Sequence, residues 1–348
     1  MRRSKQLRLK RSVSVIGHSP DVVELRSGVW NAESYTLTDH AGSNTLFTLV
    51  SSLDGTRSRG EIAKQAGVPR AEVEALVDHL DQLNLIEEQS ASALEAYLDR
   101  VDTLTSDLAG ATVDTPIHLV GDHDLGARIL AELGPAGAGE QAGIVPATDP
   151  AWQAVLDLER AGATDGMALA EAAEAARQWQ GDLVLLAETT VNPLRLRALN
   201  RLSAEVGFPW LHSAVDGPFL LIGPTILPRR SACFECFETR VSMNLREGSA
   251  YQRYKNALTE GSVRLGSPPV FGPLLGLLAA HVALEAVNYL HTGTTFTVEK
   301  CLSVYLPTME MGYHEVLRLP GCAGCGPVVE RDDASLYFDA RAWIGEGA

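Results

Sequence analysis

Two Cys-x-x-Cys motifs, Cys233/Cys236 and Cys322/Cys325, constrain the fold of this chain more than any other feature of its sequence. The two-residue gap lets both sulfurs of a motif reach one ion, and two motifs supply the four thiolates of a closed tetrahedral zinc site. A thioredoxin-like redox pair is the alternative, but the presence of a second motif favours a structural metal. The fold must therefore bring the two motifs together. Cys301, the fifth cysteine, is expected to be a small buried residue.

Charge and hydropathy argue against a nucleic-acid-binding protein, a secreted protein and a membrane protein. The 348 residues carry a net charge of −15, which argues against nucleic-acid binding because phosphate contacts need clustered Lys and Arg. Basic residues do crowd positions 2–11, as a solvated tail or as a steering patch for an acidic peptide, and no secretory signal follows them. The most apolar window, 270–286, contains His281 and Glu285 and predicts a buried helix. We therefore expect a cytoplasmic protein without membrane contact.

Residues 1–90 are predicted to form an N-terminal module of three short strands followed by three helices. Turn residues separate the β-prone runs, and Ser58 with Glu61 predicts a capping box at the start of the second helix. The expected strands are 13–16, 22–25 and 34–38, and the expected helices are 44–53, 58–66 and 69–84. This order is typical of a winged helix-turn-helix.

The third helix of this module decides between DNA and peptide as the ligand. It carries four carboxylates against one arginine, namely Glu72, Glu74, Asp78 and Asp81 against Arg70. Phosphates would be repelled by such a surface, so DNA binding is disfavoured. An extended peptide fits better, because its backbone can pair with the exposed edge strand around Tyr35 while its side chains lie against the third helix.

A second domain is expected over residues 116–348, after a connector, 91–115, that is predicted to be helical from Ala93 to Leu108. Short apolar runs alternate with helical patterns in this domain, which predicts a doubly wound parallel sheet of the α/β class. The expected strands are 117–120, 143–145, 182–187 and 209–212, and the expected helices are 125–133, 168–178 and 193–206.

The loop after the first of these strands reads Gly121-Asp-His-Asp-Leu-Gly126. A loop that cradles a nucleotide would read Gly-x-Gly-x-x-Gly, but here His123 takes the middle position and two aspartates flank it. Carboxylates beside a phosphate pocket are repulsive, so we expect that ATP binding is lost. His123 as a catalytic base is a weaker alternative, since the sequence contains neither Gly-x-Ser-x-Gly nor His-Glu-x-x-His.

Several of these motifs resemble known families. Residues 13–88 look like the PqqD-type RiPP recognition element, which binds leader peptides; the resemblance rests on Leu53-Asp-Gly-Thr-Arg57, Glu61-Ile-Ala63 and the Val73-x-x-Leu-Val-x-x-Leu80 pattern. Residues 116–326 look like the ThiF/MccB-type ubiquitin-activating fold. That resemblance rests on Asp182-Leu-Val-Leu-Leu-Ala187, Pro209-Trp-Leu-His212, Cys233-Phe-Glu-Cys-Phe-Glu-Thr-Arg240 and the late cysteine pair. The closing Leu336-Tyr-Phe-Asp-Ala-Arg341 is similar to the tail of ocin-ThiF-like proteins.

Those proteins are partners of YcaO cyclodehydratases in thiazole/oxazole-modified peptide and thiopeptide biosynthesis. The resemblance implies a non-catalytic protein that binds the leader of a precursor peptide and presents its core to a separate YcaO enzyme. That enzyme uses ATP to form azolines from Cys, Ser and Thr. A homodimer is also typical of the ThiF-type fold.

The resemblance places leader contacts on the third strand and the third helix. The implied residues are Ser34, Tyr35, Thr36, Leu37, Thr38, Val73, Leu76, Val77 and Leu80, although some of the helix residues must pack the small core instead. An adenylating enzyme that acts on a peptide carboxylate is the alternative. In that case Glu188 would take the place of the family's magnesium-binding aspartate.

Overall fold

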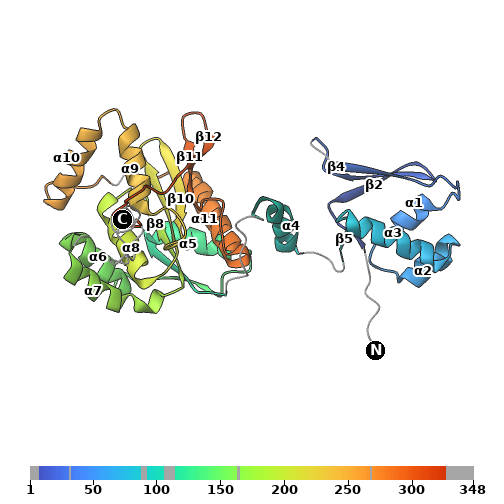
Figure 1. Ribbon diagram of the computed structural model, residues 1–348, viewed down its shortest axis with the longest axis horizontal. Coiled ribbons are helices and arrows are strands. Elements are labelled where there is room, and N and C mark those ends of the chain that lie inside the picture. Colours follow the sequence, from blue (N-terminus) through green and yellow to red (C-terminus); the bar gives the residue numbers. More distant parts are fainter. Residues whose placement is uncertain are drawn as a thin grey trace, which may run out of the picture. The chain divides into compact units, whose positions relative to one another are not determined.

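The computed structural model describes residues 8–30, 33–87, 92–105, 114–162, 165–266 and 269–326. The chain divides into two compact units, residues 1–101 and 102–348, and each is described by itself (Figure 1). The helical prediction for the connector holds over α4 (Ala93–Thr105), while its last expected residues, 106–108, lie outside the described residues.

The first unit contains the three predicted strands followed by the three predicted helices, together with two short strands that were not predicted. Its elements are β1 (Arg8–Leu9), β2 (Val13–Ser19), β3 (Val22–Ser27), β4 (Glu33–Thr38), α1 (Leu46–Ser51), α2 (Arg59–Ala66), α3 (Arg70–Gln82) and β5 (Ile86–Glu87). Strands β2, β3 and β4 form an antiparallel sheet in that order, so β4 is an edge strand, and β1 pairs with β5.

Local signals account for the helix boundaries in this unit. The predicted capping box is confirmed, because the Ser58 side chain accepts from the Glu61 amide and the Glu61 carboxylate accepts from the Ser58 amide. Gly67 ends α2 in the left-handed conformation that glycine tolerates best. Helix α1 begins two residues later than expected because Asn44, with φ of 60°, is not helical.

The second unit is a mixed α/β domain. Its elements are β6 (Ile117–Gly121), α5 (His123–Leu133), β7 (Ala142–Ile144), α6 (Pro150–Ala161), α7 (Gly166–Ala175), η1 (Arg177–Trp179), β8 (Leu183–Ala187), α8 (Pro193–Val206), β9 (Trp210–Asp216), β10 (Phe219–Ile226), α9 (Phe234–Asn244), α10 (Gly248–Thr259), α11 (Gly272–Thr292), β11 (Lys300–Tyr305) and β12 (Glu310–Glu315). Its seven-stranded sheet has the order β12-β11-β10-β9-β8-β6-β7.

The prediction of a doubly wound parallel sheet is confirmed for the four predicted strands, but the sheet continues with antiparallel strands that were not predicted. Strands β7, β6, β8 and β9 are parallel, but β9, β10, β11 and β12 are antiparallel. Only Gly217 and Pro218 separate β9 from β10, and so short a link makes a hairpin, whereas a parallel crossover needs a dozen or more residues.

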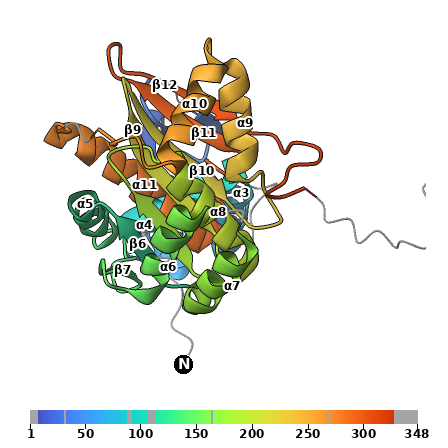
Figure 2. The ribbon, with the colours of Figure 1, turned by 90° about the vertical axis from the view of Figure 1, so that its left-hand side faces the viewer.

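Helices cover both faces of the sheet, so β8 is buried along its whole length (Figure 2). Helices α6, α7 and α8 enclose a core that includes the fully buried Trp179, Phe208 and Trp210. Helix α11 packs against α5, β9 and β10. Its length and composition would also suit a membrane span, but 56% of its most apolar window is buried inside the protein, as expected for a core helix.

Candidate functional site

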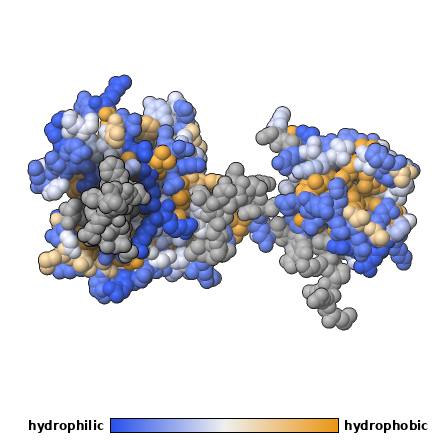
Figure 3. All heavy atoms as spheres, in the orientation of Figure 1, coloured by the Kyte–Doolittle hydropathy of each residue, from blue (hydrophilic) through white to orange (hydrophobic). Residues whose placement is uncertain are grey.

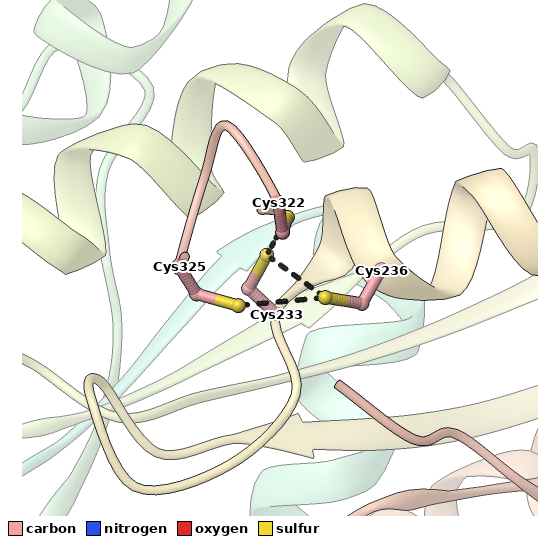
Figure 4. Close-up of side chains that lie close together, drawn as sticks. All are labelled: Cys233, Cys236, Cys322 and Cys325. Carbon is pink, nitrogen blue, oxygen red and sulfur yellow. Dashed lines mark hydrogen bonds between the residues drawn. The ribbon is translucent and has the colours of Figure 1, made fainter. Parts of the chain in front are cut away.

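The four paired cysteines come together at the start of α9, as predicted (Figure 4). Cys233 is the N-cap residue of α9 and Cys236 lies in its first turn, whereas Cys322 and Cys325 lie in the turn that follows β12. All four sulfurs lie within 4.8 Å of one another. The start of a helix supplies two of the sulfur ligands and a tight turn supplies the other two. The fold brings them together although Cys236 and Cys322 lie 86 positions apart in the sequence.

The spacing of these sulfurs fits a tetrahedral zinc ion. Zinc–sulfur bonds of about 2.3 Å give sulfur–sulfur edges of roughly 3.8 Å. The Sγ–Sγ distances are 4.0 Å for Cys233–Cys236, 3.7 Å for Cys233–Cys322 and 3.4 Å for Cys236–Cys325. All four cysteines are free thiols, which excludes a disulfide arrangement in this structure.

Backbone groups around the cluster are arranged to hold thiolates. The Leu319 amide donates to Cys236 Sγ and the Gly324 amide donates to Cys322 Sγ, both at 3.4 Å. A Cβ at position 324 would lie 3.1 Å from Cys233 Sγ and 3.0 Å from the Glu235 carboxylate, so these side chains would have to shift to admit it. At position 326 a Cβ would lie 2.3 Å from the Cys322 carbonyl oxygen, so the turn that holds the second cysteine pair requires glycine there.

Arginines tie the cysteine turn to the rest of the domain. Arg201 binds the Glu235 carboxylate through Nε at 2.5 Å and Nη2 at 3.1 Å, and donates to the Ala323 carbonyl at 3.0 Å. Arg318 donates to the Cys325 carbonyl at 2.9 Å. Burial at Cys325 is outweighed by hydrogen bonds, which lower the pKa of its thiol, and Arg318 contributes to this shift. The charge of Arg201 is balanced by Glu235.

Burial acts on the thiols in the opposite direction. It raises the pKa of the Cys233 thiol, and it raises the pKa of Cys236 to about 11. Without an ion these two thiols would stay protonated at neutral pH, so metal binding would release protons. Cys301 is 2% exposed, as expected for a small buried residue, and its thiol donates to the Gly223 carbonyl at 3.4 Å.

In the first unit a groove of about 440 Å³ lies between the edge strand β4 and helix α3. The groove is lined by Thr36, Leu37, Thr38, Asp39, Leu46, Leu49, Glu72, Ala75, Leu76 and His79. Figure 3 shows apolar surface on this unit between the strands and the helices. Within the described residues no strand pairs with the outer edge of β4.

The structure shows which residues of α3 pack the core of the unit and which line the groove. Val73, Val77 and Leu80 are 1%, 2% and 0% exposed and belong to the core, so their assignment as leader contacts is corrected. The next stripe of the helix, at spacing i, i+3, i+4 and i+7, faces the groove and includes Leu76. Most residues of the groove stripe come one position before a residue of the core stripe, so the two stripes lie side by side on the helix.

The predicted strand residues are also distributed between these roles. Thr36, Leu37 and Thr38 line the groove. Ser34 is exposed on β4 outside it, and Tyr35 packs against the core of the unit.

The loop after β6 keeps a tight turn. Gly121 has φ of 105°, and a Cβ there would lie 2.4 Å from the Ala187 carbonyl oxygen. Asp122 caps α5, since its Oδ1 accepts from the Asp124 amide at 3.0 Å and the Leu125 amide at 3.2 Å. The helix N-terminus that would bind a phosphate is therefore filled by a carboxylate of the chain itself.

Beside this loop is a cavity of about 380 Å³ that contains a buried ion cluster which the sequence did not predict. Arg195 binds Glu159 at 2.7 Å and also binds Glu188, whose side chain is 7% exposed. Asn192 donates to Glu159 at 2.6 Å. Burial outweighs the attraction of Arg195 and raises the pKa of Glu188 to about 7. The sequence predicts Glu188 as a magnesium ligand only for the adenylating alternative, and it does not predict Arg195 as its partner.

No protein-family model matches the sequence, and no curated protein matches it. Solved structures do match. A heterocyclase in complex with substrate and cofactor has a TM-score of 0.62 at 15% identity, and the match covers 92% of this chain and 39% of the other. The heterocyclase TruD has a TM-score of 0.62 at 19% identity, with 92% and 43% covered.

The microcin C7 biosynthetic enzyme MccB in complex with N-formylated MccA is a further structural match. It has a TM-score of 0.54 at 13% identity, and 92% of this chain and 99% of the other are covered. At these identities the similarity shows a shared fold. The chain spans about two-fifths of the length of the heterocyclase chains.

Proposed function

We propose that this chain is a non-catalytic partner protein that binds the leader of a ribosomally made precursor peptide. The first unit acts as a winged-helix RiPP recognition element, and the groove between β4 and α3 is the observation that carries the proposal. A separate YcaO cyclodehydratase then forms azolines from Cys, Ser and Thr in the core of the bound peptide. The structural similarity to a heterocyclase supports a role in peptide modification.

The leader binds by extending the sheet. Its backbone pairs with the free edge of β4, while its apolar side chains enter the groove beside Leu76 and Leu46. Main-chain hydrogen bonds supply affinity along the strand, and the groove selects the side chains. The tethered core is then held at a high effective concentration near the enzyme.

The second unit has a structural role in this proposal. Zinc, bound by Cys233, Cys236, Cys322 and Cys325, joins α9 to the turn after β12. This chain spans about two-fifths of the length of the heterocyclase chains, and the proposal assigns the ATP-dependent step to the separate enzyme. A reducing cytoplasm, where thiols stay free for metal, is the compartment expected for such a site.

The charges around the loop at Gly121 support the proposal that ATP binding is lost. Asp122 occupies the α5 N-terminus, and the cation nearest the cavity, Arg195, is already bound by two carboxylates. A triphosphate would meet negative charge without an unpaired cation among the residues lining the cavity.

An adenylating enzyme is the second candidate. The observation in its favour is the similarity to MccB over nearly the whole chain. It would require Glu188 to exchange its contact with Arg195 for a magnesium ion.

Replacement of Leu76 by Glu tests the groove assignment. Burying one leucine-sized contact contributes about 1.5–3 kcal/mol, so we expect leader affinity to fall roughly 10- to 100-fold. Fluorescence anisotropy with a labelled leader peptide encoded beside this protein measures the loss. Ala71→Glu adds the same charge to an exposed position of α3 outside the groove and should leave affinity unchanged. Unaltered binding by a folded Leu76→Glu variant with normal zinc content would refute the assignment.

A further inference from the structure

A pocket at the amino ends of the parallel strands has no role in the proposed function. Its volume is about 420 Å³, within the range of about 300–1,000 Å³ that is usual for small-molecule sites. Gly181 and Pro209, which precede β8 and β9, line this pocket, whereas Glu188 follows β8 and lines the cavity beside Gly121. Ligands of doubly wound folds usually bind at the carboxyl ends of the strands, so a site at the amino ends is a separate one.

Polar side chains without a partner gather in this pocket. It is lined by Gln180, Tyr289 and two consecutive arginines, Arg229 and Arg230. Among the described residues, neither of these guanidinium groups forms an ion pair or a hydrogen bond, and neither does the side-chain amide of Gln180. The pocket therefore holds several hydrogen-bond donors that the chain itself does not use.

The two pocket arginines, Arg229 and Arg230, differ in this respect from other arginines of the domain. The chain has 44 acidic residues against 29 lysines and arginines, so carboxylate partners are plentiful. Arg195, Arg197 and Arg201 each bind a glutamate. The pocket arginines bind none within the described part of the chain, and both are exposed, so their positive charge is available to an anionic ligand.

The loop that carries the pocket arginines is held in a fixed shape. Arg229 has φ of 64°, and this left-handed turn lets two consecutive side chains line one pocket, whereas in a strand they would point to opposite sides. Ser231 is 1% exposed and closes the turn by accepting from the Leu227 amide at 2.9 Å. Arg318 donates to the Arg229 carbonyl at 3.4 Å and to the Cys325 carbonyl at 2.9 Å, so the loop is joined to the cysteine turn. A ligand would therefore meet a preorganised loop.

The charges around the pocket favour a ligand with a single negative charge. Glu205 also lines the pocket, and α8 ends beside it with C-terminal carbonyls that carry partial negative charge. These groups oppose the two guanidinium groups and would repel a dianionic phosphate more than a carboxylate. A carboxylate can also accept two parallel N–H bonds from one guanidinium group. The pocket therefore fits a carboxylate better than a phosphate.

The remaining wall of the pocket is apolar. It is formed by Val206, Leu227 and Pro228. Tyr289 adds an aromatic ring and is 8% exposed; burial raises the pKa of its phenol, and the nearby charge of Arg230 opposes this shift. An apolar group can lie against this wall while its carboxylate reaches the arginines.

We propose that this pocket binds an organic acid in which a carboxylate, held by Arg229 and Arg230, is attached to an apolar group. A free small acid and the carboxyl end of a peptide share this chemistry, and titration with one probe of each kind distinguishes them. The site goes beyond the proposed leader binding, because it lies wholly in the second unit and does not use the groove of the first.

Ligand-observed NMR titration of the full-length, zinc-loaded protein tests the site. We expect N-acetyl-leucine to bind with a Kd of about 1 mM, which is usual for so small a ligand. N-acetyl-leucine amide lacks the charge and inorganic phosphate lacks the apolar group, so each should bind roughly tenfold more weakly or less. Acetyl-Ala-Ala-Leu with a free carboxyl end should bind more tightly than N-acetyl-leucine if the ligand is a peptide, and more weakly if it is a free acid.

Three variants test the residues with N-acetyl-leucine as the probe. Arg229→Gln combined with Arg230→Gln should lower affinity about tenfold or more. Glu205→Gln removes the opposing carboxylate and should raise affinity roughly two- to fivefold, a gain that misfolding cannot produce. Arg253→Gln is the matched control, because Arg253 is exposed on α10 outside the pocket, and it should leave affinity unchanged.

Several results would overturn the proposal. These are the absence of binding by both carboxylate probes, equal binding of the acid and its amide, and phosphate binding as tight as that of the acid. Unchanged affinity in the double arginine variant, with a normal melting temperature and zinc content, would also overturn it, and so would a Glu205→Gln variant that binds no more tightly than the wild type. Leader affinity is independent of these outcomes.

Discussion

His212 should make the protein less stable in mild acid. It lies on β9 with 2% of its surface exposed, near the rings of Trp210 and Phe237. Its Nδ1 has no hydrogen-bond partner among the residues that the structure describes. Burial lowers the pKa of His212 from 6.5 to about 4, because the charged imidazolium would be left without water.

The sign of the effect follows from the two pKa values. Above pH 6.5 the ring is neutral in both states, so His212 does not change stability with pH. As the pH falls below 6.5 the unfolded chain binds a proton that the folded protein binds only near pH 4. The free energy of unfolding should therefore fall by about 3 kcal/mol across this window, at roughly 1.4 kcal/mol per pKa unit.

Urea denaturation of the wild type and of His212→Phe at pH 7 and pH 4.5 measures this loss. Other titrating groups, the cysteines included, act in both proteins and cancel in the difference between them. We expect the wild type to lose roughly 2–3 kcal/mol more than the variant between the two pH values. The comparison uses only the change in the free energy of unfolding between the two pH values, so the variant does not need the same stability as the wild type at pH 7. An equal loss in both proteins would refute the argument that His212 is buried in its neutral form.

Three other changes have defined outcomes. Cys325→Ser removes one zinc ligand and should lower both metal content and the melting temperature, measured by emission spectrometry and calorimetry, while leader binding by the first unit persists. Arg195→Ala leaves the buried Glu188 carboxylate without its cation, while Glu159 keeps the hydrogen bond from Asn192; the change should cost about 3–5 kcal/mol in urea denaturation, and adding Glu188→Gln should recover part of it. Ser58→Ala should cost about 1 kcal/mol through loss of the capping box, without a change in zinc content.

Local signals predicted much of the fold. The capping box at Ser58 and the helix over Pro193–Val206 could both be predicted from the sequence, because caps and apolar periodicity depend on residues only a few positions apart. The cysteine cluster was also predicted, since zinc coordination leaves little choice of partners. Helix α6 was missed, although Asp149 as N-cap and Pro150 in its first turn are signals for it.

Features that depend on distant contacts were harder to predict. The antiparallel strands after β9 follow from how the hairpin at Gly217 turns, and the sequence analysis did not identify that hairpin. Arg195 meets Glu159 and Glu188 only because the fold brings three separate segments together. The division of α3 into a core stripe and a groove stripe likewise depends on where β4 lies, so Leu76 could not be distinguished from Val73 by periodicity alone.

The most direct test of the proposed function is isothermal titration of the zinc-loaded protein with the leader peptide and, separately, with ATP and magnesium. The proposal predicts leader binding with a Kd of about 1 μM or below and no heat from ATP. Clear ATP binding, or no binding of the leader, would contradict it. ATP binding would instead support an adenylating site formed by Glu188 and the loop at Gly121.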